Sequence, residues 1–157
     1  GITLSPENGM ELDLQHHIHH NHVTGAQGDG IRVGNAPGSR LDHNVCENNG
    51  LDGIYLAGSP NCTAAQNQTS FNRRLGIEVG NSPACVVTEN EANNNVEMGI
   101  YVWGTCRTTF ELTKAAGNGL WDLFVANWDL DIPPTCNTYL MNQAGTAYPS
   151  LALWDVN

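Results

Sequence analysis

The stretch Asp52-Gly53-Ile54-Tyr55-Leu56 decides the fold, because its pattern returns along the chain at a constant spacing of 23 residues. A Gly-Ile pair begins at each of four positions: Gly30, Gly53, Gly76 and Gly99. An asparagine keeps the same spacing at Asn21, Asn44, Asn67 and Asn90. Two unrelated residue types with one common period indicate a repeat. A period of about 20 to 50 residues is typical of a solenoid, whose units bury their apolar faces by stacking on one another.

The apolar residues of the repeat predict short β-strands. Three columns at the same spacing contain mostly small or apolar residues: Ile18, Leu41, Ala64, Val87 and Phe110; Val33, Leu56, Val79, Val102 and Val125; and Val23, Cys46, Thr69, Ala92 and Ala115. Arg32 separates Ile31 from Val33, so the repeat alternates with the period of two that strands show. Clusters of Gly, Asn, Pro and Ser interrupt every repeat and leave no room for a helix of ordinary length.

Asparagine is expected to connect successive coils. A second asparagine column keeps the spacing at Asn49, Asn72, Asn95 and Asn118. An amide side chain donates through its nitrogen and accepts through its oxygen, so a stacked asparagine can bond to the coils on both sides of it. The sequence therefore predicts two asparagine ladders.

These motifs together resemble a known repeat. The segments Ile18-His19-His20-Asn21-His22-Val23, Asn48-Asn49-Gly50 and Asp52-Gly53-Ile54-Tyr55-Leu56 are similar to the repeat of the right-handed parallel β-helix, found in the pectate-lyase-like superfamily and in NosD-like and secreted bacterial β-helix repeat proteins. The similarity covers roughly residues 9–128, and residues 138–149 resemble the ends of the secreted bacterial proteins. The resemblance implies an all-β, right-handed parallel β-helix with 23 residues per coil and says little about activity.

The length fits one domain over residues 1–157, with regular coils over about residues 9–128 and an irregular closing segment over 129–157. We expect about six coils, which at ~4.8 Å per coil form a stack ~30 Å tall. Because Gly9 precedes Gly30 by only 21 residues, the first coil is expected to be short.

The charge excludes two classes of partner. The net charge is −10, and Lys and Arg together number 6. Nucleic acids and anionic membrane surfaces are bound through basic patches, so neither is expected as a partner. The sequence has no run of about 18 apolar residues that would insert into a membrane.

Localisation follows from the resemblance, which implies a secreted, extracellular or periplasmic protein. No secretory signal peptide is visible, and the chain begins at Gly1. We therefore expect the numbering to start after a processed or omitted segment.

The cysteine count is odd, so at least one thiol is unpaired: Cys46, Cys62, Cys85, Cys106 and Cys136. Cys62 and Cys85 occupy one column on adjacent coils, where a buried thiol ladder is favoured over a disulfide because stacked side chains are poorly angled for bonding. Cys106 and Cys136 flank the irregular closing segment, and a disulfide between them would close a long loop there.

Histidines suggest a metal site. Folding the chain at 23 brings His20 beside His43 and His19 beside Asp42, a group that could hold Cu or Zn. The alternative is a set of solvated polar residues or hydrogen-bonded ladder members on the outside of an early coil. NosD-like proteins are associated with copper, but no ligand can be transferred from them.

Carboxylates suggest a second site. Asp29 and Asp52 share a column, and if both point outward they stack within ~5 Å, where they could serve acid/base chemistry or bind Ca. The alternative is that each aspartate caps a glycine-containing turn. Glu78 lies on the outward strand position and is the third candidate for a catalytic carboxylate.

Aromatic residues gather at the outward positions of the Ile-x-Val strand. The expected outward column reads Glu11, Arg32, Tyr55, Glu78, Tyr101 and Phe124, with Trp103 nearby. Sugar rings dock on aromatic faces beside carboxylates, so Tyr55, Tyr101, Trp103 and Phe124 are candidates for polysaccharide binding. Stacking of these rings along the solenoid is the structural alternative.

Three functions remain open. The first is a non-catalytic extracellular scaffold or adhesive module that binds glycan or assembles end to end into a filament through its open coil ends. The second is a polysaccharide lyase, hydrolase or epimerase, although the Asn-Thr-Asp, Gly-His-Gly and Asp-Pro-His signatures of such enzymes in this superfamily do not occur. The third is a periplasmic copper- or zinc-binding repeat protein. No cofactor is certain, and Ca, Cu and Zn are the candidates.

Overall fold

The computed structural model describes residues 1–5, 15–126 and 136–148, which form three parallel β-sheets and contain no α-helix. Sheet A consists of β1 (Ile2–Leu4), β4 (Ile31–Gly34), β7 (Ile54–Ala57), β10 (Leu75–Gly80), β13 (Met98–Trp103), β16 (Trp121–Ala126) and β19 (Ala147–Tyr148). Sheet B consists of β2 (His17–His19), β5 (Arg40–Asp42), β8 (Thr63–Ala65), β11 (Val86–Thr88), β14 (Thr109–Glu111) and β17 (Thr138–Leu140). Sheet C consists of β3 (His22–Thr24), β6 (Val45–Glu47), β9 (Gln68–Ser70), β12 (Glu91–Asn93), β15 (Lys114–Ala116) and β18 (Gln143–Ala144).

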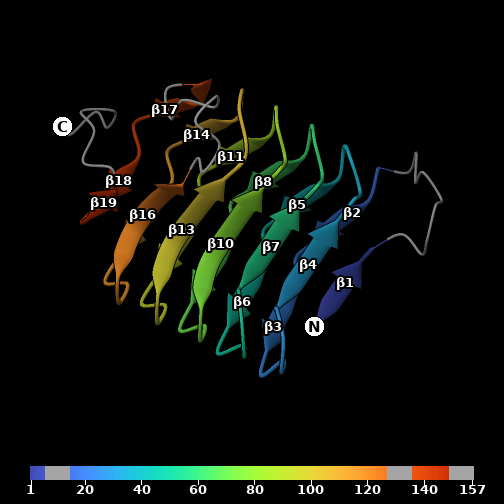
Figure 1. Ribbon diagram of the computed structural model, residues 1–157. Helices are drawn as coiled ribbons and strands as arrows, with labels where there is room; N and C mark the ends of the chain where they lie inside the picture. The colour runs from blue at the N-terminus through green and yellow to red at the C-terminus, as the bar shows by residue number, and fades with distance from the viewer. Residues whose placement is uncertain (6–14, 127–135, 149–157) are drawn as a thin grey trace.

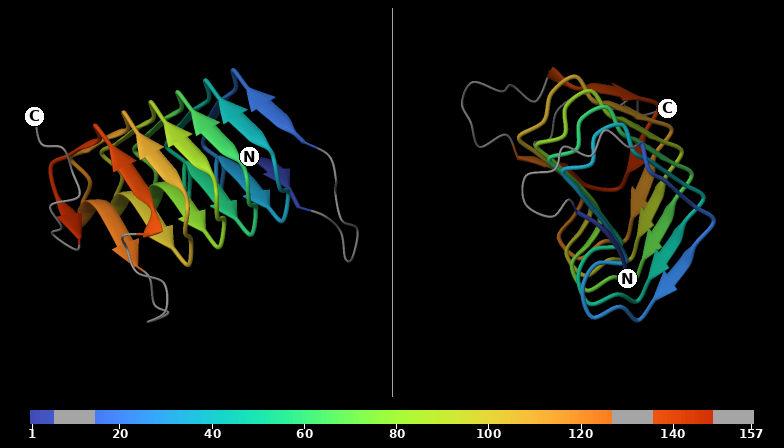
Figure 2. Two further views of the ribbon diagram at one scale, coloured as in Figure 1. Left: turned by 90° about the horizontal axis from the view of Figure 1, so that it is seen from above. Right: turned by 90° about the vertical axis from the view of Figure 1, so that its right-hand side faces the viewer.

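Each coil contributes one strand to each sheet, so the chain winds as a solenoid (Figure 1). The view along the stack in Figure 2 shows the coils superposed around one elongated cross-section. The predicted class, an all-β parallel β-helix, is confirmed. Sheets B and C have six strands each, so about five complete turns separate their ends, slightly fewer than the six coils expected.

The period of 23 holds through the middle of the stack, where Ile54 pairs with Ile31 on one side and Ile77 on the other. The first turn departs from it. Strand β4 is preceded in sheet A by β1, and Thr3 pairs with Arg32. The first turn is therefore longer than the others, not shorter, and the prediction of a short first coil starting at Gly9 is wrong. Gly9 and Glu11 themselves lie outside the described residues.

The interior follows the predicted columns. Side chains of the Ile31 and Val33 columns alternate inward along sheet A and are almost completely buried. The columns of Leu41 in sheet B and Cys46 in sheet C close the same core. Full burial of one such aliphatic side chain contributes about 1.5–3 kcal/mol. The core therefore runs the length of the stack, and each coil depends on its neighbours.

Both asparagine ladders are present. Asn44 donates through Nδ2 to Asn67 Oδ1 at 2.9 Å and to the carbonyl of Ile18 at 3.0 Å, and its Oδ1 accepts from the backbone of Asn21 at 3.1 Å. The second ladder repeats this arrangement from Asn49 to Asn118. These amides satisfy backbone groups at two corners of every coil, which is why asparagine keeps the period.

Glycine keeps the period for a steric reason. A Cβ on Gly53 would lie 2.8 Å from the carbonyl oxygen of Gly76 and 2.8 Å from Nδ2 of Asn72. Any larger residue would push adjacent coils apart at the corner that leads into sheet A.

The cysteines divide into two groups. Cys46, Cys62 and Cys85 are free and buried, and burial raises the pKa of the Cys46 thiol to about 12. The backbone N–H of Cys62 donates to Sγ of Cys85 at 3.3 Å, so these two thiols form a ladder at the corner between sheets A and B. Cys106 and Cys136 are joined by a disulfide beside the closing coil, with their Cα atoms 5.1 Å apart.

The open ends of the stack carry the strands β1, β2 and β3 at one side and β17, β18 and β19 at the other. Strand edges of this kind favour pairing with another chain. Association into a filament concerns more than one chain and stays a prediction.

Candidate functional site

The outward face of sheet A carries one column of side chains, one from each rung of the sheet. In order along the stack these are Thr3, Arg32, Tyr55, Glu78, Tyr101, Phe124 and Tyr148. Each residue pairs with the next through adjacent parallel strands, which lie ~4.8 Å apart. We call this set the outer column of sheet A.

A charged cluster occupies the middle of this face. Arg74 donates through Nε to Oδ1 of Asp52 at 2.7 Å, and its Nη2 contacts Oδ2 of Asp52 and Oε2 of Glu78. Asp52 is completely buried and Glu78 is 5% exposed. One guanidinium therefore joins two buried carboxylates, and its hydrogen bonds with Asp52 raise the pKa of Arg74, which stays charged.

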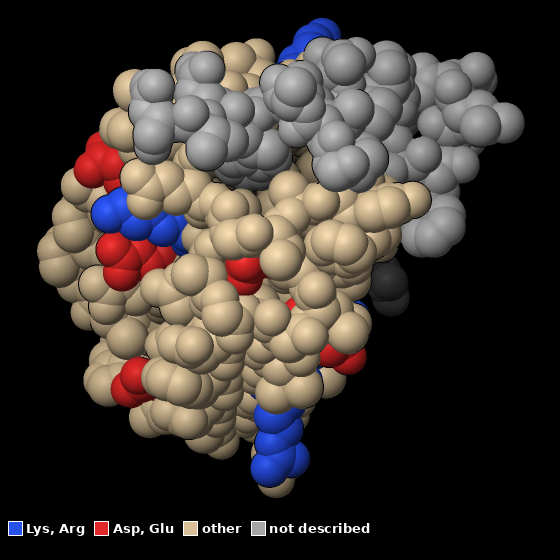
Figure 3. Space-filling view, turned by 90° about the vertical axis from the view of Figure 1, so that its left-hand side faces the viewer, with Lys and Arg blue, Asp and Glu red and all other residues tan. Residues whose placement is uncertain are grey.

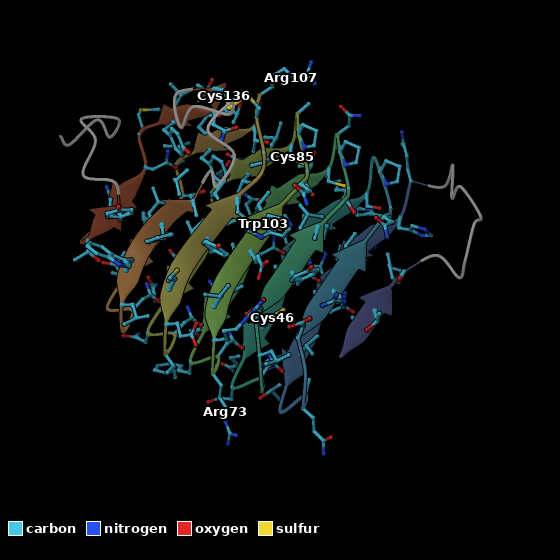
Figure 4. All side chains as sticks on the ribbon, in the orientation of Figure 1. Cys46, Arg73, Cys85, Trp103, Arg107 and Cys136 are labelled. Carbon is cyan, nitrogen blue, oxygen red and sulfur yellow. A yellow bond between two sulfur atoms is a disulfide. The ribbon has the colours of Figure 1, made fainter. Side chains whose placement is uncertain are left out.

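Glu78 is held from its other side by Trp103. The indole Nε1–H donates to Oε1 of Glu78 at 2.7 Å. The ring reaches Glu78 by lying over Gly80, where a Cβ would stand 2.2 Å from Cε2 of the indole (Figure 4). Burial raises the pKa of Glu78; the bond from Trp103 and the charge of Arg74 oppose this shift, while the charge of Asp52 adds to it.

Asp29 and Asp52 do not form a bare carboxylate pair. Oδ1 of Asp29 accepts the backbone N–H of Asp52 at 3.1 Å, and Oδ1 of Asp52 accepts the backbone N–H of Leu75 at 3.1 Å. Each aspartate thus bonds to the next coil, much as the asparagines do, and each is neutralised by an arginine. Asp29 bonds to Arg32 at 3.0 Å, and the guanidinium of Arg32 lies 4.0 Å above the ring of Tyr55.

The last coils carry an aromatic row. The rings of Tyr101 and Phe124 have centroids 5.8 Å apart, and those of Phe124 and Tyr148 are stacked at 4.9 Å with an interplanar angle of 14°. Trp121 contacts Tyr148 from the side at 5.6 Å. Tyr148 is 49% exposed, and the other three are half-buried. Of the predicted sugar-binding residues, Tyr101 and Phe124 belong to this row, whereas Tyr55 pairs with Arg32 and Trp103 with Glu78.

A second cluster lies at the corner between sheets B and C of the first two coils. His20, Asp42 and His43 each present a ligand atom within 4.8 Å of the others. The rings of His20 and His43 are stacked at 4.7 Å with an interplanar angle of 3°. Nδ1 of His19 lies 3.1 Å from Nδ1 of His20. The structure therefore brings together the four residues that the period placed side by side.

Asp42 is the centre of this histidine cluster. His43 bonds to its Oδ2 at 3.0 Å, Arg40 donates to its Oδ1 at 2.7 Å, and His17 bonds to the same Oδ1. Burial alone would raise the pKa of Asp42, but the bonds from His43, His17 and Arg40 outweigh it and hold the pKa well below its usual range. The carboxylate therefore stays ionised.

Sequence reasoning missed several members of both sites. Arg74 precedes the strand by one residue and reaches back along the stack, so its partners depend on side-chain length. Tyr148 escapes the search because it lies 24 residues after Phe124, one beyond the period. The contacts of His17 and Arg40 with Asp42 run between neighbouring positions of one face and follow directly from the pairing of β2 with β5.

Charge and shape elsewhere add little. A pocket of about 270 Å³ beside Asp29 and Arg32 lies at the first rung and does not reach the aromatic row. The end view nearest β19 shows Lys and Arg scattered singly, without a basic patch on that face (Figure 3). In the described ranges, none of the secondary structure is a helix that could cross a membrane.

Comparison with solved structures returns β-helix enzymes. The periplasmic alginate epimerase AlgG aligns with 80% of this chain and 36% of its own length, at 19% identity and a TM-score of 0.52. The A-module of the Azotobacter vinelandii mannuronan C-5 epimerase AlgE4 aligns with 73% of this chain and 40% of its own, at 16% identity and a TM-score of 0.45. The chain thus spans well under half of either structure, and the likeness to AlgG concerns the fold alone.

Comparison with curated proteins gives no match. The family model described as "Right handed beta helix region" matches residues 9–115, which is more than half of the chain. With the parallel three-sheet solenoid and its ladders in place, the chain belongs to the right-handed β-helix family.

Proposed function

We propose that this protein is a non-catalytic polysaccharide-binding module whose binding surface is the outward face of sheet A. The observation that carries the proposal is the aromatic row of Tyr101, Phe124 and Tyr148 on three consecutive rungs, flanked by Trp121. Aromatic rings present large apolar faces at little entropic cost, and the apolar face of a sugar ring packs against them. Rings repeated at the rung spacing suit a ligand that is itself a repeating chain.

The state of the carboxylates favours binding over hydrolysis. Glycoside hydrolysis uses two carboxyl groups on opposite sides of the scissile bond. Asp52 is completely buried and occupied by Arg74 and the backbone of Leu75. Glu78 is occupied by Arg74 and Trp103. Of the candidates Asp29, Asp52 and Glu78, none presents a free carboxylate to a bound sugar.

The ligand class follows from charge and fold. A net charge of −10 repels anionic polymers, so we assign a neutral polysaccharide. The alginate epimerase AlgG, which shares the fold, supports a polysaccharide as the general class of partner. A secreted or periplasmic location accompanies this function, and the Cys106–Cys136 disulfide supports an oxidising compartment.

The proposal is tested by affinity electrophoresis of the purified chain in gels that contain soluble neutral glycans. The native chain is expected to be retarded by at least one neutral glycan, and Phe124→Ala combined with Tyr148→Ala is expected to abolish the retardation. Phe71→Ala is the matched control, because Phe71 is an aromatic residue with 55% exposure away from sheet A. Equal loss in the control, or no retardation of the native chain, would refute the proposal.

One observation favours an enzyme as the second candidate. The pKa of Glu78 is raised by burial, and a buried carboxyl of raised pKa beside a tryptophan is a feature of general acids. A polysaccharide lyase, hydrolase or epimerase using Glu78 would release reducing ends or unsaturated products, or change uronate composition. A screen of neutral and uronate polymers with the native chain and Glu78→Gln separates this candidate from binding alone.

A further inference from the structure

The histidine cluster at the corner between sheets B and C is separate from the proposed glycan surface. We infer that His20, Asp42 and His43 form a binding site for a divalent transition-metal ion, zinc or copper, with His19 beside them as a fourth ligand. Residues of adjacent coils contribute equally, so the ion would bridge the coils that contain β2 and β5. The inference does not depend on the proposed function.

The donor set suits these ions. Neutral imidazole nitrogens together with one carboxylate oxygen are ligands that zinc and copper accept, whereas Ca and Mg prefer oxygen ligands throughout. Two imidazoles and one carboxylate present atoms within 4.8 Å of one another. Three protein ligands leave the fourth position to His19 or solvent, since His19 and His20 are exposed.

The distances within each coil fit tetrahedral coordination. With bonds of about 2.0–2.1 Å, two ligand atoms on zinc lie ~3.4 Å apart. Nδ1 of His43 is 3.0 Å from Oδ2 of Asp42 on one coil, and Nδ1 of His19 is 3.1 Å from Nδ1 of His20 on the other. Small rotations of exposed rings are enough to bring these pairs toward a common ion.

The surroundings hold the carboxylate in its ligating form. Asp42 is 4% exposed and ionised, and His17 and Arg40 both contact its Oδ1, whereas Oδ2 faces His43. Bonds to the remaining oxygen of a ligating carboxylate fix its orientation. The guanidinium of Arg40 belongs to a side chain that is 58% exposed, so it can turn toward solvent as a cation approaches.

The backbone fixes the two central imidazoles. His20 and His43 adopt the left-handed conformation, with φ of 54° and 55°, at equivalent corner positions. Histidine is one of the few residues enriched in this region. The equivalent residue of the next coil is Gln66, also left-handed with φ of 55°. Glutamine is therefore a replacement that this corner already accommodates.

The test is calorimetric titration of the folded chain with zinc chloride and, separately, copper(II) chloride. The native chain is expected to bind one equivalent of at least one ion. His20→Gln combined with His43→Gln is expected to weaken binding by more than about 100-fold, because losing even an outer partner of a metal ligand costs about 10–100-fold. The free thiols of Cys46, Cys62 and Cys85 are buried and do not compete.

His22→Ala is the matched control. His22 belongs to the same histidine-rich segment but contacts Glu47 at 2.8 Å instead of the cluster. Binding that survives in His22→Ala and is lost in the double variant supports the site. Equal weakening in both variants would show only a diffuse affinity of surface histidines and would overturn the inference, as would the absence of binding by the native chain. Circular dichroism establishes that each variant is folded.

Discussion

Trp103 donates its indole N–H to Glu78 across 2.7 Å, from the rung that follows Glu78 in sheet A. The contact depends on Gly80, the strand neighbour of Trp103, because the ring occupies the space where a Cβ would stand. A hydrogen bond to a charged group contributes about 1.5–3 kcal/mol. Glycine, tryptophan and glutamate are thus one unit of the proposed glycan surface.

The first prediction concerns Gly80→Ala. The added methyl group would displace the indole and break its bond to Glu78, so we expect a loss of about 1–3 kcal/mol in the free energy of unfolding, measured by chemical denaturation. Gly34→Ala is the control, because Gly34 belongs to the same column and a Cβ there would meet nothing closer than 4.0 Å. Equal effects of the two substitutions would contradict the role assigned to Gly80.

The second prediction concerns pH. The pKa of Glu78 is raised in the folded chain from its ordinary value of 4.5, mainly by burial, beside Arg74 and Asp52. The folded state therefore binds this proton more tightly than the unfolded state, so the contribution of Glu78 to stability is fully present below pH 4.5 and declines as the pH rises through the folded pKa.

Glu78→Gln removes this titration while keeping the shape of the side chain. The stability of the native chain minus that of Glu78→Gln is expected to fall as the pH rises above about 4.5, measured by denaturation at a series of pH values. A difference that grows with pH would mean that the pairing with Arg74 outweighs burial, opposite to the assignment made here.

The sequence predicted the fold because a strict period places every residue above its counterpart. The ladder from Asn21 to Asn90 and the proximity of His20 to His43 both follow from a count of 23. The same count failed wherever the chain leaves the period. In the first turn it placed Gly9 where β1 lies, because a longer connection precedes β2.

The candidate sites depend on more than the period. Nothing in the count shows that Arg74 reaches both Asp52 and Glu78, or that Trp103 folds over Gly80. These contacts are set by side-chain length, rotamer and the space left by a neighbouring glycine. The period predicts which columns are adjacent; the direction of each long side chain has to be observed.

The third prediction concerns the interior of a ladder. Asn67 is completely buried, donates to the carbonyl of Leu41 at 3.0 Å and to Asn90 at 3.0 Å, and accepts from the backbone of Asn44 at 3.0 Å. Asn67→Ala leaves several buried backbone groups without partners, at about 1–3 kcal/mol each. We expect it to destabilise the chain by at least about 3 kcal/mol in chemical denaturation.

Asn21→Ala is the matched control for the ladder. Asn21 is half-buried at the end of the same column, so water can replace part of what it loses. Its substitution is expected to cost less than half as much as that of Asn67. If the end of the ladder proved as sensitive as its middle, the ladder would not be stabilised by buried hydrogen bonds in the way described.

The fourth prediction concerns the disulfide between Cys106 and Cys136, which are separated by 30 residues in the sequence. Closing a loop of this length restricts the unfolded chain and stabilises the folded one by about 3–4 kcal/mol. Cys106→Ser combined with Cys136→Ser is expected to lose this amount, and dithiothreitol is expected to lower the stability of the native chain but not that of the double variant. The remaining cysteines are free, so reduction has no other disulfide to act on within the described residues. Stability of the native chain that is indifferent to reductant would show that the closing coil is held by its strand pairing with β14 and β15 alone.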